Sequence, residues 1–500
     1  MTKYEDVINL AVRRSIFYPA SEIYANAPAG MFDYGPYGTS IKRKVVELWR
    51  KELVQKEDFM EIDGAQIMPA DVFKASGHLK SFSDPITQCK KCSATYRADK
   101  FLSEATGENY PEAMLPEEYT KEIEKHKLKC TKCKGELLPV VKFNLMVKAE
   151  VGIRSKTECY LRPESCQSIF VDFARMNKTM RMKLPKGISQ IGRVFRNEIS
   201  PRQTLIRTIE FSQMETEIFF DPEKIDEIEN FDEVKDYKVR IARVGKEQIE
   251  EVKAEDLVKK KIVSGKLVAY YLSRVQQLYE AYGIPLEAMR FREVPKNDRA
   301  FYSKETWDFE VLTAVGWLEL NSNNYRTDYD LTGHMETSKQ DMHFVYPDGK
   351  KIIPHVFENS IGVDRTFYAI LEHAYKEEEK KGEKRILLSL KPYLAPLAAA
   401  VFPLLSNKPE LVAKAKEVYS LLKPCYVIAY DESGSVGKRY ARMDEIGCPF
   451  CLTIDFDSLA NDDVTIRERD STEQKRVKIK ELCNVLFQLI TEQKAVKDLK

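Results

Sequence analysis

The sequence predicts an α+β domain built on an antiparallel sheet, followed by a smaller α/β domain. The 500 residues exceed the roughly 100 to 200 that one domain usually holds. Over Gly192–Phe220 apolar and polar residues recur with a period near two, which indicates a pair of antiparallel strands. From Leu390 onward, strand and helix patterns alternate, as is typical of a separate α/β unit with a largely parallel sheet.

The composition is that of an ordinary soluble globular protein. Hydrophobic residues make up 43% and charged residues 31% of the chain, and the formal net charge is +1. The longest uncharged apolar run, Ala395–Leu405, is shorter than the roughly 18 residues that a spanning helix needs, so we expect no membrane segment. The N-terminus has neither a secretory apolar core nor an acid-free, Arg-rich leader, so we expect a cytoplasmic location. Because the total charge is near zero, any nucleic-acid partner must be held by local basic patches.

The first 140 residues predict a helix, a strand and an inserted module. Thr39–Lys56 has apolar residues near helical spacing, which predicts an amphipathic helix capped by Thr39 or Ser40. Met60–Ile67 is expected to be a strand. The stretch at about residues 85–140 loses periodicity and contains many charges, so we interpret it as an insertion.

The middle of the chain completes the first domain. The strand pair is expected to be joined by a loop at Ile199–Thr204. Residues 221–300 are interpreted as a second insertion, in which Asp221–Lys266 is rich in Glu and Lys and predicts a solvated surface. The remaining expected elements are a strand over Val311–Leu320, a strand at His355–Phe357, a helix over Val363–Tyr375 and a charged linker over Lys376–Arg385.

The C-terminal unit is expected to begin at residue 389 and to alternate strands with helices. The predicted strands and helices are Ala398–Phe402, Glu410–Leu422, Cys425–Tyr430, Gly437–Ile446 and Phe450–Phe456, in that order.

The strand pair carries an unusual set of charges for a sheet surface. Arg196 and Glu198 share one face, and Arg207 and Phe211 share a face of the returning strand; Arg202 lies in the loop. A solvated antiparallel face is the ordinary interpretation of such a hairpin. An arginine beside an aromatic residue, with carboxylates farther along the face, instead suits a phosphate chain whose flat base stacks on the ring, with a cation nearby.

Two CxxC pairs predict a metal site. Cys89 with Cys92, and Cys130 with Cys133, can supply the four thiolates that Zn²⁺ binds tetrahedrally, although the 37 residues between the pairs exceed the usual gap. Four reduced surface thiols are the alternative. A third pair, Cys448–Cys451, runs into a predicted strand, so we expect it to pack in a core.

Long motifs give the chain a family resemblance. FRNEISPR, LIRTIEFSQMETEIFF and PHVFENSIGVDR resemble motifs two and three of the class II aminoacyl-tRNA synthetases, and their wording is similar to that of the homodimeric glycyl-tRNA synthetases. IYANAPAGMFDYGP, MPADVFKASGH, ECYLRPESCQSIF and SGSVGKRYARMDEIG extend the likeness over nearly the whole chain. The resemblance implies a class II catalytic domain over residues 1–388, an anticodon-binding domain over residues 389–500, a homodimer, and ligation of glycine to tRNA(Gly) through a glycyl-adenylate.

The resemblance also implies an ATP site with Mg²⁺. Arg196 is expected to grip the α-phosphate and the attacking carboxylate, and Arg207 and Arg365 the far end of the triphosphate. Glu198 and Phe211 are expected to hold the adenine. Glu319 and Glu358 are the expected Mg²⁺ and ATP carboxylates, and the predicted set is completed by Asn197, Ile206, Leu320 and Gly362.

Glycine offers no side chain to bind, so its selection must come from capture of the ammonium group and exclusion of larger amino acids. By resemblance, Glu164, Glu215 and Ser360 hold the ammonium, with contributions from Glu358 and Arg97. Ordinary ion pairing is the alternative for Glu164 and Glu215.

Three positions depart from the family wording. Ser322 and Tyr325 stand where Gly and Asp are usual, and Asn359 stands where Pro is usual. Two alternatives remain: a class II synthetase for another amino acid, such as proline, threonine or histidine, and a non-catalytic nucleic-acid-binding paralogue.

Overall fold

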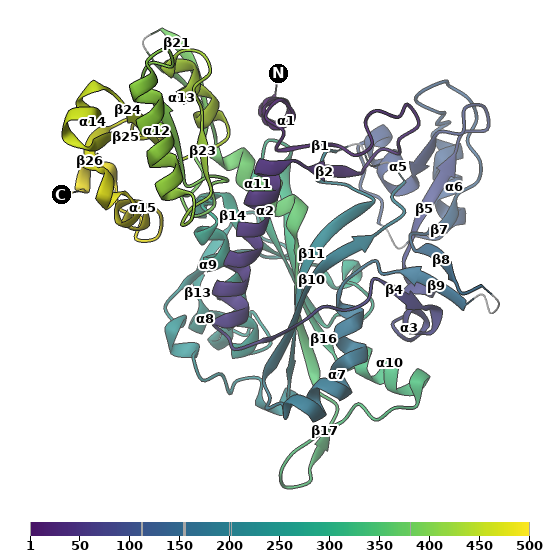
Figure 1. Cartoon of the computed structure of the whole chain (residues 1–500). Coiled ribbons are helices and arrows are strands. Elements are labelled where there is room, and N and C mark those ends of the chain that lie inside the picture. The colour runs from purple at the N-terminus through teal and green to yellow at the C-terminus, as the bar shows by residue number, and fades with distance from the viewer. Residues whose placement is uncertain are drawn as a thin grey trace.

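The computed structural model describes residues 2–111, 114–153, 157–199, 201, 203–380 and 382–499. Arg202 of the expected loop lies outside these residues. Figure 1 shows a large N-terminal part around a long twisted sheet, with the C-terminal residues forming a separate lobe beside helix α1 (Lys3–Arg13). Within the described residues no helix is long and apolar enough to cross a membrane.

The N-terminal part is organised by a nine-stranded sheet with the order β13-β12-β14-β15-β16-β19-β11-β10-β3. All neighbours are antiparallel except β3 with β10 and β12 with β14, which confirms the predicted antiparallel sheet. The strands are β3 (Met60–Ile62), β10 (Lys186–Phe195), β11 (Glu210–Phe220), β12 (Lys238–Ala242), β13 (Glu250–Lys253), β14 (Met289–Glu293), β15 (Glu305–Thr313), β16 (Gly316–Thr327) and β19 (His355–Gly362).

The two faces of β11 explain where the site lies. Its even-numbered residues, among them Met214 and Ile218, pack in the main core with α2 (Pro36–Trp49), α9 (Lys266–Ala281) and α11 (Val363–Ala374). On the opposite face Phe219 packs beneath α7 (Cys166–Met180) and α10 (Tyr329–Ser338), in a second core cluster. Phe211 and Gln213 lie on the same face as Phe219 and line a cavity instead. The period-two pattern is therefore confirmed for this strand, whereas Arg196, Glu198 and Arg207, which were expected on strand faces, lie in the connection between β10 and β11.

The prediction of a solvated surface over Asp221–Lys266 is wrong, because many apolar residues of this segment are buried. Strands β12 to β14 extend the main sheet, and α9 has twelve buried residues, including Tyr270, Tyr271 and Tyr279. The charges of the preceding segment alternate with buried apolar residues such as Val239 and Ile241. Short elements that complete this region are η2 (Pro222–Lys224), η3 (Phe231–Glu233), α8 (Ala254–Lys259), η4 (Leu286–Ala288) and η5 (Lys296–Asp298).

The first predicted helix begins earlier than its expected cap. Helix α2 starts at Pro36, after Gly35, and no side chain caps it; Thr39 instead donates to the carbonyl of Tyr34. Proline suits this first helical position because its missing N–H would have no partner there. The helix continues as the π-helical segment η1 (Arg50–Gln55), and the expected strand after it divides into β3 and β4 (Ile67–Pro69), which belong to different sheets.

The expected module at residues 85–140 forms its own small unit. Its sheet has the order β6-β5-β7, and Phe101, Leu102, Tyr119 and Ile123 are buried together beside it. The elements are β5 (Ser83–Gln88), β6 (Thr95–Arg97), α5 (Ala98–Thr106), α6 (Pro116–Lys125) and β7 (Val141–Asn144). Neighbouring elements are β1 (Phe17–Pro19), β2 (Phe32–Tyr34), α3 (Ala70–Ala75), α4 (His78–Ser81), β8 (Val147–Val151), β9 (Thr157–Leu161), β17 (Phe344–Val345) and β18 (Lys351–Ile352).

The predicted linker is a hairpin, because β20 (Tyr375–Lys380) pairs with β21 (Glu383–Leu388). Its residue Arg385 donates to Asp444, at 2.9 Å, and to the carbonyl of Arg469, which attaches the hairpin to the C-terminal lobe. The linker prediction is therefore wrong: opposite charges pair across the two strands in place of a solvated charge run.

The C-terminal lobe is α/β as predicted, but its sheet is mixed. The order is β23-β22-β24-β25-β26; β22 is parallel to β23 and β24, whereas β24, β25 and β26 are antiparallel. Cys448 and Cys451 are buried in its core, as expected. The elements are β22 (Ala399–Pro403), α12 (Pro409–Leu422), β23 (Ile428–Tyr430), α13 (Val436–Glu445), β24 (Phe450–Ile454), α14 (Phe456–Asn461), β25 (Asp463–Glu468), β26 (Gln474–Lys478), η6 (Ile479–Glu481), α15 (Leu482–Ile490) and η7 (Val496–Asp498).

Candidate active site

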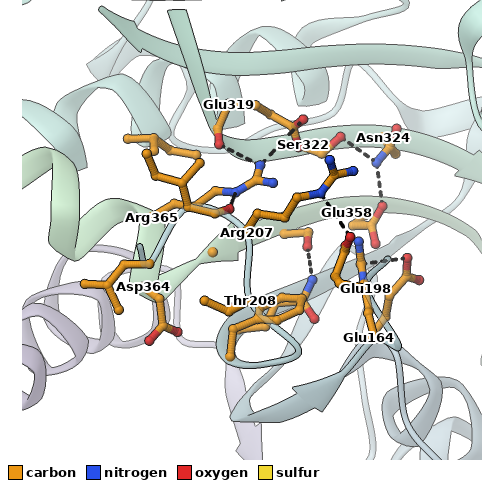
Figure 2. A pocket seen from close by; sticks show the side chains of 18 of the residues that line it. Glu164, Glu198, Arg207, Thr208, Glu319, Ser322, Asn324, Glu358, Asp364 and Arg365 are labelled. Atoms are coloured by element: carbon orange, nitrogen blue, oxygen red, sulfur yellow. Dashed lines mark hydrogen bonds and ion pairs between the residues drawn. The ribbon is translucent and has the colours of Figure 1, made fainter. Parts of the chain in front are cut away.

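A cavity of about 270 Å³ opens on the sheet face described above, beyond the part that α7 and α10 cover. Strands β11, β16 and β19, the loop between β10 and β11, and the start of α11 surround it. Its lining residues are Glu164, Arg196, Glu198, Leu205, Ile206, Arg207, Thr208, Phe211, Gln213, Tyr302, Glu319, Leu320, Ser322, Asn324, Glu358, Ser360, Gly362, Asp364 and Arg365. Figure 2 shows Arg365 and Glu319 toward one side of this cavity and Glu164 and Glu358 toward the other.

Toward the Glu319 side of the cavity, the guanidiniums of Arg365 and Arg207 are partly exposed. Arg365 donates to the carbonyls of Ile206 and Glu319, at 2.9 and 3.0 Å, while its nearest carboxylate oxygen, on Glu319, is 3.9 Å away. Arg207 donates to Glu198 at 3.0 Å. Carbonyl partners fix the position of Arg365 and leave most of its charge uncompensated, so this end can receive an anion.

Arg196 lies near two aromatic rings and near Glu164. Its guanidinium is 5.3 Å from the ring centroids of both Phe82 and Phe211, and its Nε donates to the carbonyl of Pro163 at 3.1 Å. An Nη atom is 3.5 Å from Glu164. The arginine is thus held by a carbonyl and lies near two rings, and its remaining N–H groups can contact an anion.

The opposite side of the cavity carries the carboxyl groups of Glu164 and Glu358. His78 approaches Glu164 at 3.3 Å and is itself bonded to Ser76. Burial opposes ionisation of Glu164, but the hydrogen bond and charge of His78 and the charge of Arg196 outweigh it and lower the pKa of Glu164. Glu358 accepts from Asn324 at 2.7 Å. A fixed carboxylate pair of this kind can hold a small cation.

Glu358 is also held by a wholly buried arginine. Arg326 donates to Glu358 at 2.9 Å and, through two nitrogens, to Asp330 at 2.7 and 2.9 Å. The side chains of Arg326 and Asp330 are 0% exposed. The guanidinium therefore compensates two carboxylates that water does not reach.

Comparison with known proteins gives two family models that match the chain. The model of the tRNA synthetase class II core domain (G, H, P, S and T) matches residues 147–374, and that of the anticodon binding domain matches residues 398–489. A glycine–tRNA ligase from Methanothrix thermoacetophila is 36% identical, with 98% of each chain covered. One from Pyrococcus furiosus is 38% identical, with 98% of this chain and 99% of the relative covered. The chain belongs to the glycine–tRNA ligase family.

The fold agrees with this membership. A solved structure of the RNA binding domain of threonyl-tRNA synthetase from Cryptosporidium parvum covers 96% of this chain and 97% of its own, with a TM-score of 0.59 and 18% identity. That likeness supports the fold alone. The class II core and the C-terminal anticodon-binding lobe predicted from the motifs are confirmed, and so is the resemblance to the glycine–tRNA ligase family.

Most residues predicted by resemblance to this family do line the cavity. They are Arg196, Glu198, Ile206, Arg207, Phe211, Glu319, Leu320, Glu358, Gly362 and Arg365 of the ATP set, and Glu164 and Ser360 of the glycine set. Asn197, Glu215 and Arg97 do not line it. The backbone N–H of Asn197 donates to the carbonyl of Leu145, and Arg97 donates to Asp99 at 2.7 and 2.8 Å within the small module.

Glu215 lies one layer behind the cavity. It accepts hydrogen bonds from Ser165, at 2.6 Å, and from Ser360, at 2.9 Å, and Ser360 lines the cavity. Burial, followed by the charges of Glu358 and Glu164, raises the pKa of Glu215 to about 8. Its influence on a ligand therefore passes through the Ser360 hydroxyl, which donates to it.

Several residues that line the cavity were not predicted from the sequence. Asp364 accepts from Tyr34, from Lys42 at 3.3 Å and from the backbone N–H of Ser212 at 2.6 Å, and so joins α2 to the strands below the cavity. Its position next to Arg365 was the available signal. The other residues that line the cavity without having been predicted are Leu205, Thr208, Gln213, Tyr302 and Asn324.

The three departures from the family wording, taken with the neighbouring Asn324, divide into two groups. Ser322 and Asn324 line the cavity; Asn324 donates to Ser322 at 3.1 Å, and Ser322 donates to Asp308 at 3.0 Å. Tyr325 and Asn359 lie outside it, where Tyr325 bonds with His355 and Asn359 donates to Asn323. Only the first group can affect the shape of the cavity directly.

The four cysteines of the small module come together as predicted. Their Sγ atoms lie within 4.8 Å of one another, and the sulfur pairs Cys89–Cys133 and Cys92–Cys130 are each 3.5 Å apart. Sulfurs placed about 2.3 Å from a zinc ion would be about 3.8 Å apart. All four thiols are free of disulfides, so the donor set fits a tetrahedral metal. The hydroxyl of Tyr96, 3.1 Å from the sulfur of Cys130, adds an outer contact.

Proposed function

We propose that this chain activates glycine with ATP and transfers it to tRNA(Gly). In the first step a carboxylate oxygen of glycine attacks the α-phosphorus of ATP, and pyrophosphate leaves with the electron pair of the broken bond. In the second step a terminal ribose hydroxyl of the tRNA attacks the carbonyl carbon of the adenylate, and AMP leaves. Membership of the glycine–tRNA ligase family supports this assignment.

The separation of charge along the cavity supports the direction in which the substrates bind. Arg207 and Arg365 at one end suit the outer phosphates, and Glu164 and Glu358 at the other suit the ammonium of glycine. We assign to Arg196, which lines the same cavity and is 3.5 Å from Glu164, the contact with both the α-phosphate and the glycine carboxylate. This arrangement holds two anionic groups together and stabilises the charge that develops during the attack.

The adenine is assigned to the wall near Phe211 and Glu198. Phe211 offers a ring face already beside a guanidinium, and Glu198 offers a carboxylate that accepts from Arg207. Stacking of a purine on such a surface and a hydrogen bond from its amino group would orient the base. Ile206, Leu320 and Gly362 complete this wall.

Two metals belong to the proposal. Class II synthetases use ATP with Mg²⁺, and Glu319, beside Arg365 at the phosphate end, is the lining carboxylate that would hold this ion, which neutralises phosphate charge when bound. Zn²⁺ is assigned to the four-cysteine cluster in a structural role, because two CxxC turns from separate parts of the small module converge there. We also propose a homodimer, a cytoplasmic location, and a domain boundary near residue 388.

The amino-acid dependence of ATP–pyrophosphate exchange tests the activity. We expect exchange with glycine and none above background with proline, threonine, histidine or serine, followed by charging of a tRNA(Gly) transcript. Exchange with another of these amino acids would replace the assignment by a different synthetase. A folded wild-type protein with no exchange for any amino acid would favour the non-catalytic alternative.

Arg365→Ala tests the roles within the site. Loss of a preorganised cation is expected to lower kcat/KM for ATP about 100-fold, or ~3 kcal/mol. Arg193→Ala is the control, because Arg193 is an arginine on β10 that does not line the cavity and pairs with Glu210. Equal activity of both variants would contradict the assignment of Arg365.

A further inference from the structure

Tyr302 forms an aromatic wall of the acidic end of the cavity. It lies on the short connection between η5 and β15 and lines the cavity together with Glu164 and Glu358. Its ring centroid is 3.7 Å from the guanidinium carbon of Arg326. Because Arg326 donates directly to Glu358, the ring stands beside the group that fixes this carboxylate.

The ring is held rigidly. Arg326, beneath it, has a 0% exposed side chain and makes charge-assisted bonds to Asp330 and Glu358, so it cannot shift without breaking buried ion pairs. The rings of Phe301 and Tyr329 pack against Tyr302, at centroid distances of 5.1 and 6.4 Å. A cation–π contact is strongest where water is excluded, so displacement of this ring is costly.

The Tyr302 hydroxyl is uncharged at any ordinary pH. Burial, followed by the charge of Glu164, raises the pKa of Tyr302 well above its usual value. The structure records no hydrogen bond from this hydroxyl to any residue in its described ranges. The side chain therefore meets the cavity as a neutral, fixed surface.

The charges of the site cannot select glycine by themselves. Every α-amino acid presents the same carboxylate to Arg196 and the same ammonium to Glu164 and Glu358, so electrostatic attraction is equal for glycine and alanine. With these two groups fixed, the α-carbon must lie between Arg196 and the acidic end, where Tyr302 bounds the space. A β-carbon needs room that a rigid neighbour denies, and steric rejection of a larger substrate is the effective direction of discrimination.

We propose that Tyr302 is a specificity-determining residue whose ring excludes amino acids that carry a β-carbon. The inference rests on the proposed glycine-activating function. In it, the ring of Tyr302 rejects alanine and serine, and the surrounding carboxylates do not.

ATP–pyrophosphate exchange with glycine and with alanine tests the inference in three variants. Tyr302→Ala is expected to lower the glycine-to-alanine ratio of kcat/KM by about 10- to 100-fold, because one methyl group in a pocket is worth about 1–3 kcal/mol. Tyr302→Phe keeps the ring and should keep the ratio within about threefold. Phe456→Ala is the control: Phe456 is an aromatic residue of the C-terminal lobe, is 49% exposed and does not line the cavity, so the ratio should not change.

Binding of the non-reactive sulfamoyl analogues of glycyl- and alanyl-adenylate, measured by titration calorimetry, separates exclusion from support of Arg326. Tyr302→Ala should gain affinity for the alanyl analogue relative to the glycyl one. A glycine-to-alanine ratio that is unchanged in both assays would overturn the proposal. Loss of binding to both analogues would also overturn it, because the ring would then serve only to hold Arg326. If the wild type exchanges with glycine and Tyr302→Ala has the same glycine-to-alanine ratio as the wild type, only this inference is refuted. If the wild type shows no glycine-dependent exchange, the proposed function is refuted first.

Discussion

Replacement of Arg326 by methionine should destabilise the catalytic domain strongly. Methionine keeps much of the side-chain volume but removes three charge-assisted hydrogen bonds, of 2.7, 2.9 and 2.9 Å, to two buried carboxylates. Removing one partner of a buried ion pair costs about 3–5 kcal/mol, since it leaves an uncompensated charge. The Tyr302 stack is lost too, but neighbouring contributions do not add simply, so we expect about 4 kcal/mol in total.

Urea unfolding followed by tryptophan fluorescence measures this cost. The three tryptophans, Trp49, Trp307 and Trp317, all lie in the N-terminal part, so the signal reports that part and not the C-terminal lobe. With an m-value of about 3 kcal/mol/M, the midpoint should fall by about 1.3 M. Arg50→Met is the control, because Arg50 pairs with Glu47 and Glu61 at the surface, where such pairs contribute about 0–1 kcal/mol.

A second substitution makes the reasoning refutable. Asp330→Asn removes one of the two charges that Arg326→Met leaves unpaired, so the double variant should recover about half of the loss. If the double variant is no more stable than Arg326→Met, or if the single variant shifts the midpoint no more than Arg50→Met, buried charge compensation is not what this arginine provides.

Three further predictions concern other parts of the chain. Cys92→Ser should reduce bound zinc from about one ion per chain to none by atomic emission, and should speed proteolysis within residues 85–140; unchanged metal content would remove the cluster assignment. Glu215→Gln should gain free energy of unfolding relative to the wild type as pH rises from 5 to 8, by up to about 1.4 kcal/mol per pH unit. In the wild type, the folded carboxyl keeps its proton until its pKa of about 8, whereas the unfolded one ionises near 4.5, so the wild type loses stability over this range. Parallel pH profiles of unfolding for the two proteins would contradict the raised pKa. Arg385→Ala should impair tRNA charging while leaving glycine-dependent exchange intact, because it loosens the C-terminal lobe and touches no cavity residue; equal loss in both assays would show that the hairpin acts on the catalytic domain.

The strand pair was predictable from sequence because its information is local. The period of two over Glu210–Phe220 fixes which side chains share a face, and it separates Phe211 and Gln213 from Met214 and Ile218 without any knowledge of neighbouring strands. The family motifs are local as well, so twelve of the residues that they implied line one cavity.

Prediction failed where a segment's environment is supplied by distant parts of the chain. Asp221–Lys266 looked solvated because its charges outnumber its apolar residues, yet β12 joins the edge of the main sheet and buries Val239 and Ile241. Arg97 belongs to a motif but finds its carboxylates within the small module, and Glu215 is screened from the cavity by Ser360. A motif names a residue; it does not say which neighbour its side chain will meet.

The sequence by itself determined the family, the strand pair, the two-part organisation and the chemical types of the site: guanidiniums, carboxylates and four thiols. Only the tertiary structure decided that Arg326 compensates Glu358 and Asp330 out of reach of water, and that Tyr302 stands over it at the acidic end of the cavity. The reason is physical: charge type is a property of each residue, whereas burial and mutual distance exist only after strands and loops remote in sequence have packed together.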